Sequence, residues 1–164
     1  MKFLDKKQIE KIIKELKEDY GIKELKLDYA FYINNEDKVY LISKDIKNLN
    51  TKDLRINGLG LYFLNMSKGL RLSIEGSQII GKKATKNVHE VNETEIKEWL
   101  KGYDLDCKDL KGYQIIKYKN DFYGMGHAKD NKIKNFVPKY RRIKNVWLYY
   151  CWRGNSRIVC CNLS

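Results

Sequence analysis

The chain begins with a segment whose apolar residues recur at helical spacing. Ile9, Ile12, Ile13 and Leu16 fall at positions i, i+3, i+4 and i+7, on one face of a helix that is otherwise Lys and Glu. Gly21 follows at the place where a left-handed residue ends a helix. The pattern predicts an amphipathic helix over residues 6–19 whose apolar stripe packs on the core.

The pattern then changes to short runs of strand length. Residues 29–33 and 38–42 flank a polar Asn34-Asn35-Glu36-Asp37 segment and predict a β-hairpin. Residues 58–66 form an apolar run that is predicted to be a strand buried on both faces. Two short helices are also expected, over 44–49 after a Ser43 cap and over 74–80 after a Ser73 cap, the second closed by Gly81. Together these elements predict a compact α/β unit that ends near Lys83.

The second half continues with a strand over residues 86–91 and a helix over 93–101. Asn92 with Glu95 approximates a capping box, and Gly102 closes the helix. Three strand-like runs follow at 113–118, 122–128 and 132–137, separated by the polar turns Lys119-Asn120-Asp121 and Lys129-Asp130-Asn131. Gly124 and Gly126, inside the middle run, indicate close backbone approach or a sharp bend. Such a meander is typical of a small, strongly curved barrel.

The last segment is rich in residues that favour strands. The runs 146–152 and 157–161 surround Arg153-Gly154-Asn155-Ser156, a plausible hairpin turn. We expect residues 146–164 to close the barrel as core strands or to add an extra hairpin. Two alternatives are that Trp147 or Trp152 stacks on bases, and that the unpaired strands form a dimer interface.

The positive charge is concentrated toward the carboxy-terminal end. The formal charge of the 164 residues is +12, and the residues from Lys129 onward carry nine Lys or Arg and one acid, Asp130. A concentrated basic patch attracts a phosphate backbone, whereas an evenly basic surface indicates only solubility. A host proteome rich in Lys is the alternative explanation for the total.

Several classes of protein are disfavoured by the sequence. No apolar run approaches the roughly 20 residues of a membrane span, and the charged amino terminus is no signal peptide, so a cytoplasmic protein is expected. The Gly58-x-Gly60 pair lacks the third glycine of a dinucleotide fingerprint. Cys107, Cys151, Cys160 and Cys161 form no C-x-x-C pair, so buried thiols are expected rather than a zinc site or disulfides. We therefore expect no metal and no cofactor.

The helix ending in Gly102, the anchor Leu105, the strand opened by Gly112 and the run Gly124-Met125-Gly126-His127-Ala128 resemble a PUA domain. PUA domains are small RNA-binding pseudo-barrels. The stretch 58–142, which ends Ile-Lys-Asn-Phe-Val-Pro-Lys-Tyr-Arg-Arg, is most similar to the carboxy-terminal region of RNA cytosine-C5 methyltransferases of the Sun/Nop type. The plan of a small α/β domain followed by a PUA domain also resembles the two-domain Nip-type ribosome-biogenesis factors.

The resemblance implies an α+β fold in two parts. Residues 1–83 would form a small N-terminal α/β domain, and residues 84–164 a PUA-like mixed β pseudo-barrel. The catalytic domain of these methyltransferases carries a Pro-Cys dipeptide, and this sequence contains none. Its length leaves no room for that domain. We therefore expect a protein without enzymatic activity.

The expected function is binding of structured rRNA or tRNA in RNA modification or ribosome biogenesis. Lys132 and Lys134 alternate along one strand and share a face, and Asn135 offers a base-edge amide. The resemblance places the loop after the helix beside that sheet. The expected RNA-binding residues are Lys101, Gly102, Tyr103, Lys132, Lys134, Asn135, Lys139, Arg141 and Arg142. The alternative is a protein-interaction module that docks an RNA methyltransferase or a pre-ribosomal protein.

Overall fold

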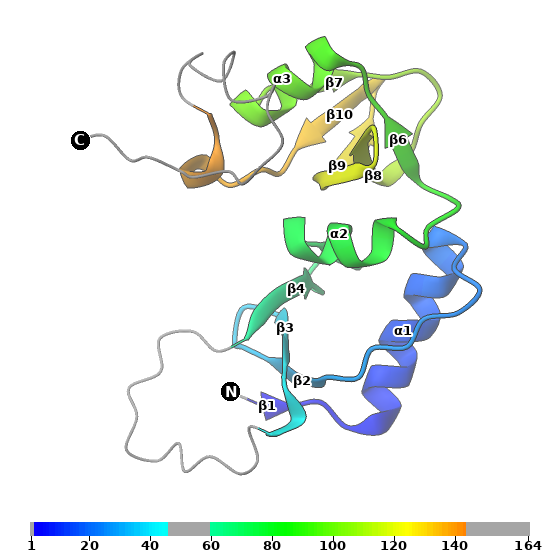
Figure 1. The fold of residues 1–164 in the computed structure, drawn as a ribbon, viewed down its shortest axis with the longest axis vertical. Helices are drawn as coiled ribbons and strands as arrows, with labels where there is room; N and C mark the ends of the chain where they lie inside the picture. Colours follow the sequence, from blue (N-terminus) through cyan, green and yellow to red (C-terminus); the bar gives the residue numbers. More distant parts are fainter. Residues whose placement is uncertain (1, 46–59, 144–164) are drawn as a thin grey trace.

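The computed structural model describes residues 2–45 and 60–143 (Figure 1). In these ranges the chain forms two five-stranded sheets and three α-helices. The expected α+β class is confirmed, and the second sheet is a curled mixed sheet of the kind found in a PUA-like pseudo-barrel. The predicted strands within 146–164, with three of the four cysteines, lie outside the described residues. Cys107 is buried, as expected.

Helix α1 (Lys6–Tyr20) begins and ends where the sequence indicates. The Asp5 carboxylate accepts from the Gln8 backbone N–H at 2.8 Å, and the Gln8 side chain accepts from the Asp5 N–H at 3.1 Å. Gly21 ends the helix with a φ of 62°. Ile12 and Leu16 are almost completely buried, and Ile9 and Ile13 pack against the same core, so the predicted apolar stripe does pack on the core.

The first sheet is antiparallel throughout, in the order β1-β2-β3-β4-β5. Its strands are β1 (Lys2–Phe3), β2 (Ala30–Ile33), β3 (Lys38–Ile42), β4 (Leu61–Asn65) and β5 (Arg71–Leu72). The β2–β3 hairpin confirms the prediction. The prediction that residues 58–66 are buried on both faces is wrong for the start of β4. Leu61 is 40% exposed, and Tyr62 is only partly buried. Tyr62 packs against Tyr40 of the neighbouring strand instead of entering the core.

Helix α2 (Ile74–Gly81) has the predicted Ser73 cap, whose hydroxyl accepts from the Gly76 N–H at 2.9 Å. Gly81 does not close the helix by a left-handed conformation, because it lies inside the last turn. A Cβ at Gly81 would come within 2.3 Å of the Phe122 ring. The glycine is therefore needed for close packing of α2 against the second sheet. Of the helix expected over residues 44–49, only residues 44 and 45 are described.

The second sheet has the order β6-β8-β9-β10-β7, with β6 parallel to β8 and the other pairs antiparallel. Its strands are β6 (Val88–Glu90), β7 (Leu105–Asp106), β8 (Gly112–Tyr118), β9 (Asp121–Lys129) and β10 (Lys132–Asn135). Helix α3 (Glu93–Lys101) carries the full capping box predicted from Asn92 and Glu95. A Cβ at Gly126 would lie 2.8 Å from the Lys134 carbonyl oxygen and 2.3 Å from the Ile133 side chain, which confirms the expected close backbone approach.

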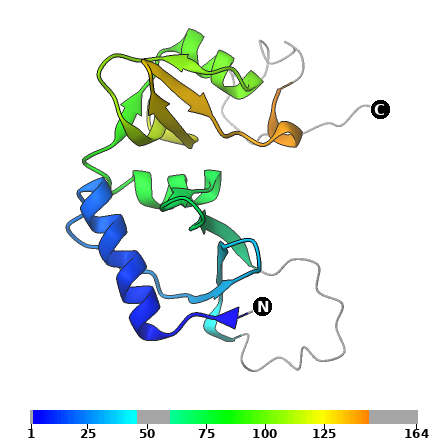
Figure 2. The same ribbon diagram turned by 180° about the vertical axis from the view of Figure 1, so that it is seen from behind.

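Helix α2 lies between the two sheets (Figures 1 and 2). One apolar cluster joins residues of α1 and the first sheet to Ile115, Phe122 and Met125 of the second sheet. The Gly124 N–H also donates to the Ser77 hydroxyl at 3.1 Å. Apolar packing is therefore continuous across residue 83, where the sequence suggested a domain boundary. The division into domains 1–83 and 84–164 stays a prediction.

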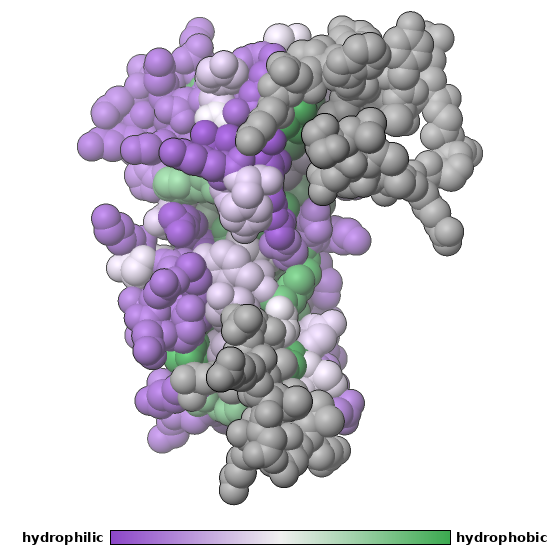
Figure 3. Space-filling model, turned by 90° about the vertical axis from the view of Figure 1, so that its left-hand side faces the viewer, coloured by the Kyte–Doolittle hydropathy of each residue, from purple (hydrophilic) through white to green (hydrophobic). Residues whose placement is uncertain are grey.

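Hydrophilic side chains dominate much of the described surface in the side view of Figure 3. No helix in the described part of the chain is long and apolar enough to cross a membrane.

Candidate nucleic-acid interface

The outer face of β10 carries two exposed lysines. Along this strand Lys132 and Lys134 are exposed while Ile133 and Asn135 are buried, as the two-residue period of a strand requires. A two-residue turn, Asp130-Asn131, connects β9 to β10 and holds both residues at positive φ. Because Asn and Asp tolerate that conformation well, the turn sequence fixes the register that presents both lysines on one face.

The lysines of β10 and the lysines of α1 differ in whether they form ion pairs with acidic side chains. On α1, Lys6, Lys11 and Lys14 each lie within 4 Å of a glutamate one turn away. Within residues 2–45 and 60–143, neither Lys132 nor Lys134 forms an ion pair, although Asp106 lies opposite Lys132 on β7. The charges on β10 are therefore less neutralised than those on α1.

A row of side chains crosses three strands next to these lysines. His127 of β9 is paired with Lys134 of β10 on one side and with Tyr113 of β8 on the other. Directly paired residues point to the same face of a sheet. The Tyr113 and His127 rings meet edge to face, with centroids 5.1 Å apart. The Tyr113 hydroxyl donates to the Lys68 carbonyl oxygen at 2.8 Å, which fixes the ring.

The first sheet adds a cation to this row. Phe136 lies beside Tyr113, with ring centroids 6.4 Å apart, and the Arg71 guanidinium carbon lies 5.0 Å from the Phe136 centroid. An arginine at this distance from a ring forms a cation–π contact. We call Arg71, Tyr113, His127, Lys134 and Phe136 the aromatic–basic patch. Its five residues come from both sheets and the segment just after β10.

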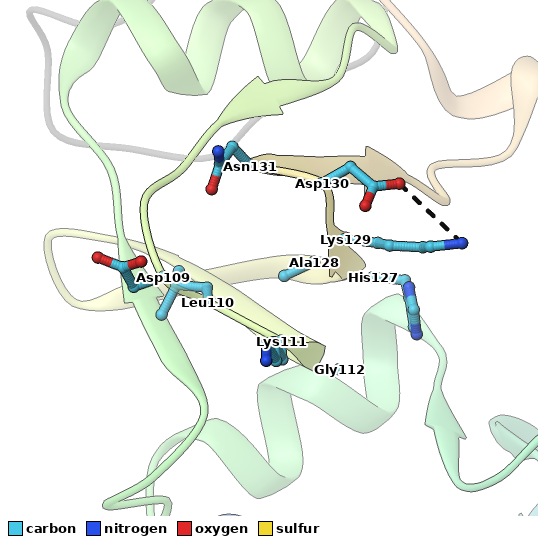
Figure 4. Close-up of a pocket in the computed structure, with 9 residues that line it drawn as sticks. All are labelled: Asp109, Leu110, Lys111, Gly112, His127, Ala128, Lys129, Asp130 and Asn131. Carbon is cyan, nitrogen blue, oxygen red and sulfur yellow. Dashed lines mark ion pairs between the residues drawn. The ribbon is translucent and has the colours of Figure 1, made fainter.

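A pocket of about 440 Å³ lies where β8 begins and β9 ends, on the side of the sheet that Ala128 and Leu110 occupy (Figure 4). His127 and Lys129 are among its lining residues, but their side chains point away from Asp109, Leu110 and Asn131 in this view. The Asp130 carboxylate lies 4.0 Å from the Lys129 ammonium group, while Asp109 lies on the other side of the pocket from His127 in this view. A Cβ at Gly112 would meet no atom within 4 Å, so this wall is open.

The loop after α3 lies against the segment that follows β10. A Cβ at Gly102 would fall 2.4 Å from the Arg142 side chain, and the Ile143 N–H donates to the Leu100 carbonyl at 3.0 Å. Gly102 and Arg142 are therefore adjacent. Lys101 is exposed and forms an ion pair with Glu98 at 2.8 Å, and Tyr103 is 59% exposed.

Lys139 and Arg141 lie in the 3₁₀ turn η2 (Lys139–Arg141), which follows Pro138. Lys139 is exposed, whereas Arg141 forms an ion pair with Glu75 of α2. The hydrogen bond from Arg141 to Glu75 raises the pKa of the Arg141 guanidinium above its ordinary value. The Arg141 charge is therefore partly neutralised, and it fastens η2 to α2.

The sequence suggested that the Asn135 amide contacts the edge of a base, but in the structure this amide is not available to a ligand. Its amide nitrogen donates to the Trp99 and Tyr103 carbonyls at 2.8 and 3.0 Å, and its amide oxygen accepts from the Val137 N–H at 2.7 Å. The residue is 8% exposed. Because the amide nitrogen and oxygen are both engaged inside the protein, Asn135 shapes the loop after α3 and does not present an amide to a ligand.

Sequence reasoning missed Arg71, Tyr113 and Phe136. Counting along the strands from the β8–β9 turn would pair Tyr113 with Gly126, and a register shift between Ile115 and Lys117 pairs it with His127 instead. No local signal connects Arg71 with Phe136, because Arg71 lies on the first sheet and Phe136 follows the last strand of the meander in the second. The described residues also bring together no group of three or more His, Cys, Asp or Glu side chains that could hold a metal ion.

The strands of the second sheet lie within a range that matches a known family model. Residues 86–143 match the family model described as the methyltransferase RsmF PUA domain. This range extends from just before β6 to just past η2, so it includes α3, β10 and the loop around Gly102.

The similarity to individual proteins extends over most of the chain. Relatives called ribosomal RNA small subunit methyltransferase F occur in Aeromonas salmonicida, 24% identical over 139 residues, and in Vibrio cholerae, 27% identical over 136 residues. These alignments cover 83% and 81% of this chain and 28% of each relative. The relative from Psychromonas ingrahamii is 29% identical over 112 residues, which is 63% of this chain and 23% of the relative.

The chain thus spans less than a third of the length of these relatives. Residues 86–143 are a PUA-like region of the kind that the RsmF group of Sun-type rRNA methyltransferases carries, which confirms the resemblance to the PUA region of Sun-type methyltransferases. The resemblance to the Nip-type factors stays an expectation.

Proposed function

We propose that this chain binds structured RNA through the outer face of its second sheet and takes part in rRNA modification or ribosome biogenesis. The observation that carries the proposal is the pair of exposed lysines on β10, within the range that matches a PUA domain. Relatives named as rRNA methyltransferases support rRNA as the ligand, and tRNA is the second choice. In this proposal the chain supplies binding without catalysis and acts in the cytoplasm, where such RNA is found.

The RNA would be held mainly through its phosphates. Lys132, Lys134 and Lys139 are exposed cations with no acidic partner among the described residues, so they can replace counterions along an RNA backbone. Lys101 and Arg142 would extend this surface along the loop after α3. Structured RNA suits such a surface, because paired RNA is read largely through its shape and backbone.

The test is RNA binding over a range of salt concentrations. Small-subunit rRNA fragments and total tRNA are titrated with the wild-type chain and with a Lys132→Ala, Lys134→Ala, Lys139→Ala variant. The matched control is Lys6→Ala, Lys11→Ala, Lys14→Ala on α1, which removes the same charge from paired lysines. We expect the salt slope of the first variant to fall by about one for each phosphate that it no longer binds, and to change less in the control.

Two results would overturn the proposal. One is equal loss of affinity in both variants, since this would attribute binding to net charge alone. The other is weak binding with no dependence on salt, which would favour a protein partner for this sheet, such as an RNA methyltransferase or a pre-ribosomal protein.

A further inference from the structure

The aromatic–basic patch is unusual for the surface of a sheet that serves only to bind phosphates. Tyr113, His127 and Phe136 are each partly exposed and lie close together, so their rings offer planar surface to solvent. Lysines alone would satisfy a phosphate backbone. Adjacent rings next to cations are the combination that proteins use to hold unpaired bases, since every base has a flat face that stacks on an aromatic ring.

Arg71 supports the interpretation that the patch binds an unpaired base. Its guanidinium lies over the Phe136 ring, and within the described ranges it forms no ion pair with a carboxylate. A guanidinium held over a ring in this way retains N–H groups for a phosphate or a base edge, and its plane can itself stack on a base.

Two lysines lie on the same face of the sheet as these rings. Lys134 is paired with His127, and Lys132 precedes it by two residues along β10. Their ammonium groups can bind the phosphates next to a stacked base.

We propose, resting on the RNA-binding function above, that this site holds one unpaired nucleotide of the bound RNA. The base stacks on one ring of the patch, because the Tyr113 and His127 rings are 79° apart in orientation, and the remaining rings and Arg71 contact its edges. Its phosphate binds Lys134 and Lys132, which lie on the same face of the sheet. The chain would then recognise paired RNA next to a bulge or loop rather than a continuous duplex.

The test compares two RNAs with the same number of phosphates, a hairpin with a loop of about seven nucleotides and a perfectly paired duplex. Phe136→Leu and His127→Ala remove rings from the patch. Phe3→Leu is the matched control, because Phe3 is 46% exposed on β1 of the first sheet and is absent from the patch. Thermal unfolding of each variant reports whether the fold is kept.

We expect the wild-type chain to bind the hairpin more tightly than the duplex. Each patch variant should bind the hairpin at least about fivefold more weakly, while its affinity for the duplex, and the affinities of the Phe3→Leu control, change by less than about twofold. A measurement that needs no variant is the fluorescence of 2-aminopurine placed in the loop, which should be quenched when its base stacks on the rings.

The outcomes separate this inference from the function on which it rests. Salt-sensitive binding of hairpin and duplex with equal affinity, or no quenching of the loop probe, would overturn the unpaired-nucleotide site and leave the RNA-binding function standing. If the patch variants lose the same affinity for the hairpin as for the duplex, the unpaired-nucleotide site would also be overturned. If neither RNA binds in a salt-sensitive way, the RNA-binding function itself fails.

Discussion

The Arg142 side chain passes directly over Gly102, so closely that a Cβ at Gly102 would lie 2.4 Å from the Arg142 Cδ. Gly102 also ends α3 with a φ of 97°, a conformation that other residues rarely adopt. The Arg142 Nε donates to the Val137 carbonyl at 3.0 Å, which holds the arginine in place. The end of α3 and the segment after β10 are thus shaped together.

Replacing Gly102 with Ala should destabilise the protein by about 1–3 kcal/mol through backbone strain and should also displace Arg142. Gly112→Ala is the control, because Gly112 has a φ of 76° but a Cβ there would touch nothing within 4 Å. Urea unfolding should give a larger decrease in stability for Gly102→Ala than for Gly112→Ala. Equal decreases would mean that Arg142 moves aside without cost.

Asn135→Leu tests the buried amide that the sequence suggested for binding a base. The leucine would leave the Trp99 and Tyr103 carbonyls and the Val137 N–H without their present partner. We expect a decrease of about 2–5 kcal/mol in the free energy of unfolding, measured by urea denaturation. Lys134→Ala, at the neighbouring exposed position, should change stability by less than about 0.5 kcal/mol. A stable Asn135→Leu chain with weakened RNA binding would contradict this structural role.

The features that were predicted best from the sequence are those set by residues close together along the chain. The capping box of Asn92 and Glu95, the stripe of α1 and the turn at Asp130-Asn131 are local features, and each is found at its expected place. The roles of Gly81 and Asn135 were misjudged because each depends on a partner that folding brings from a distance, Phe122 for the glycine and the Trp99 carbonyl for the amide.

The candidate site was predicted only in part for the same reason. The lysines of β10 follow from strand alternation, which is readable in the sequence. Arg71 contributes to the patch only because α2 packs the two sheets together, and that packing is a property of the whole core.

The ion pair between Arg141 and Glu75 should limit the contribution of Arg141 to RNA binding. Glu75→Gln removes the negative charge from α2 and leaves Arg141 free to bind a phosphate. We expect the affinity for RNA at low salt to rise by about two- to fivefold, and the gain to shrink as salt increases. Breaking this partly exposed pair should lower stability by no more than about 1 kcal/mol. A fall in affinity would instead show that the pair positions Arg141 for binding.

The pH dependence of stability can test how tightly Tyr20 of α1 is packed in the core that the two sheets share. Its hydroxyl lies 3.9 Å from the Met125 sulfur of β9, and burial raises the pKa of this hydroxyl well above its usual value near 10. The folded state therefore keeps its proton at a pH where the unfolded tyrosine ionises. The resulting stability is present below about pH 10 and is lost as the pH rises through that value toward the raised pKa of the folded state.

Tyr20→Phe removes this titration while it keeps the ring. At pH 7 the variant should be destabilised by less than about 1 kcal/mol, because the interaction with sulfur is weak. Above about pH 10 the wild-type chain should lose stability relative to the variant by up to about 1.4 kcal/mol per pH unit, since only the wild type ionises a tyrosine at this position on unfolding. Urea unfolding of both chains from neutral pH to about pH 11 measures the difference. Parallel pH profiles would mean that the Tyr20 hydroxyl reaches water, and that the packing between α1 and β9 is looser than a close-packed core requires.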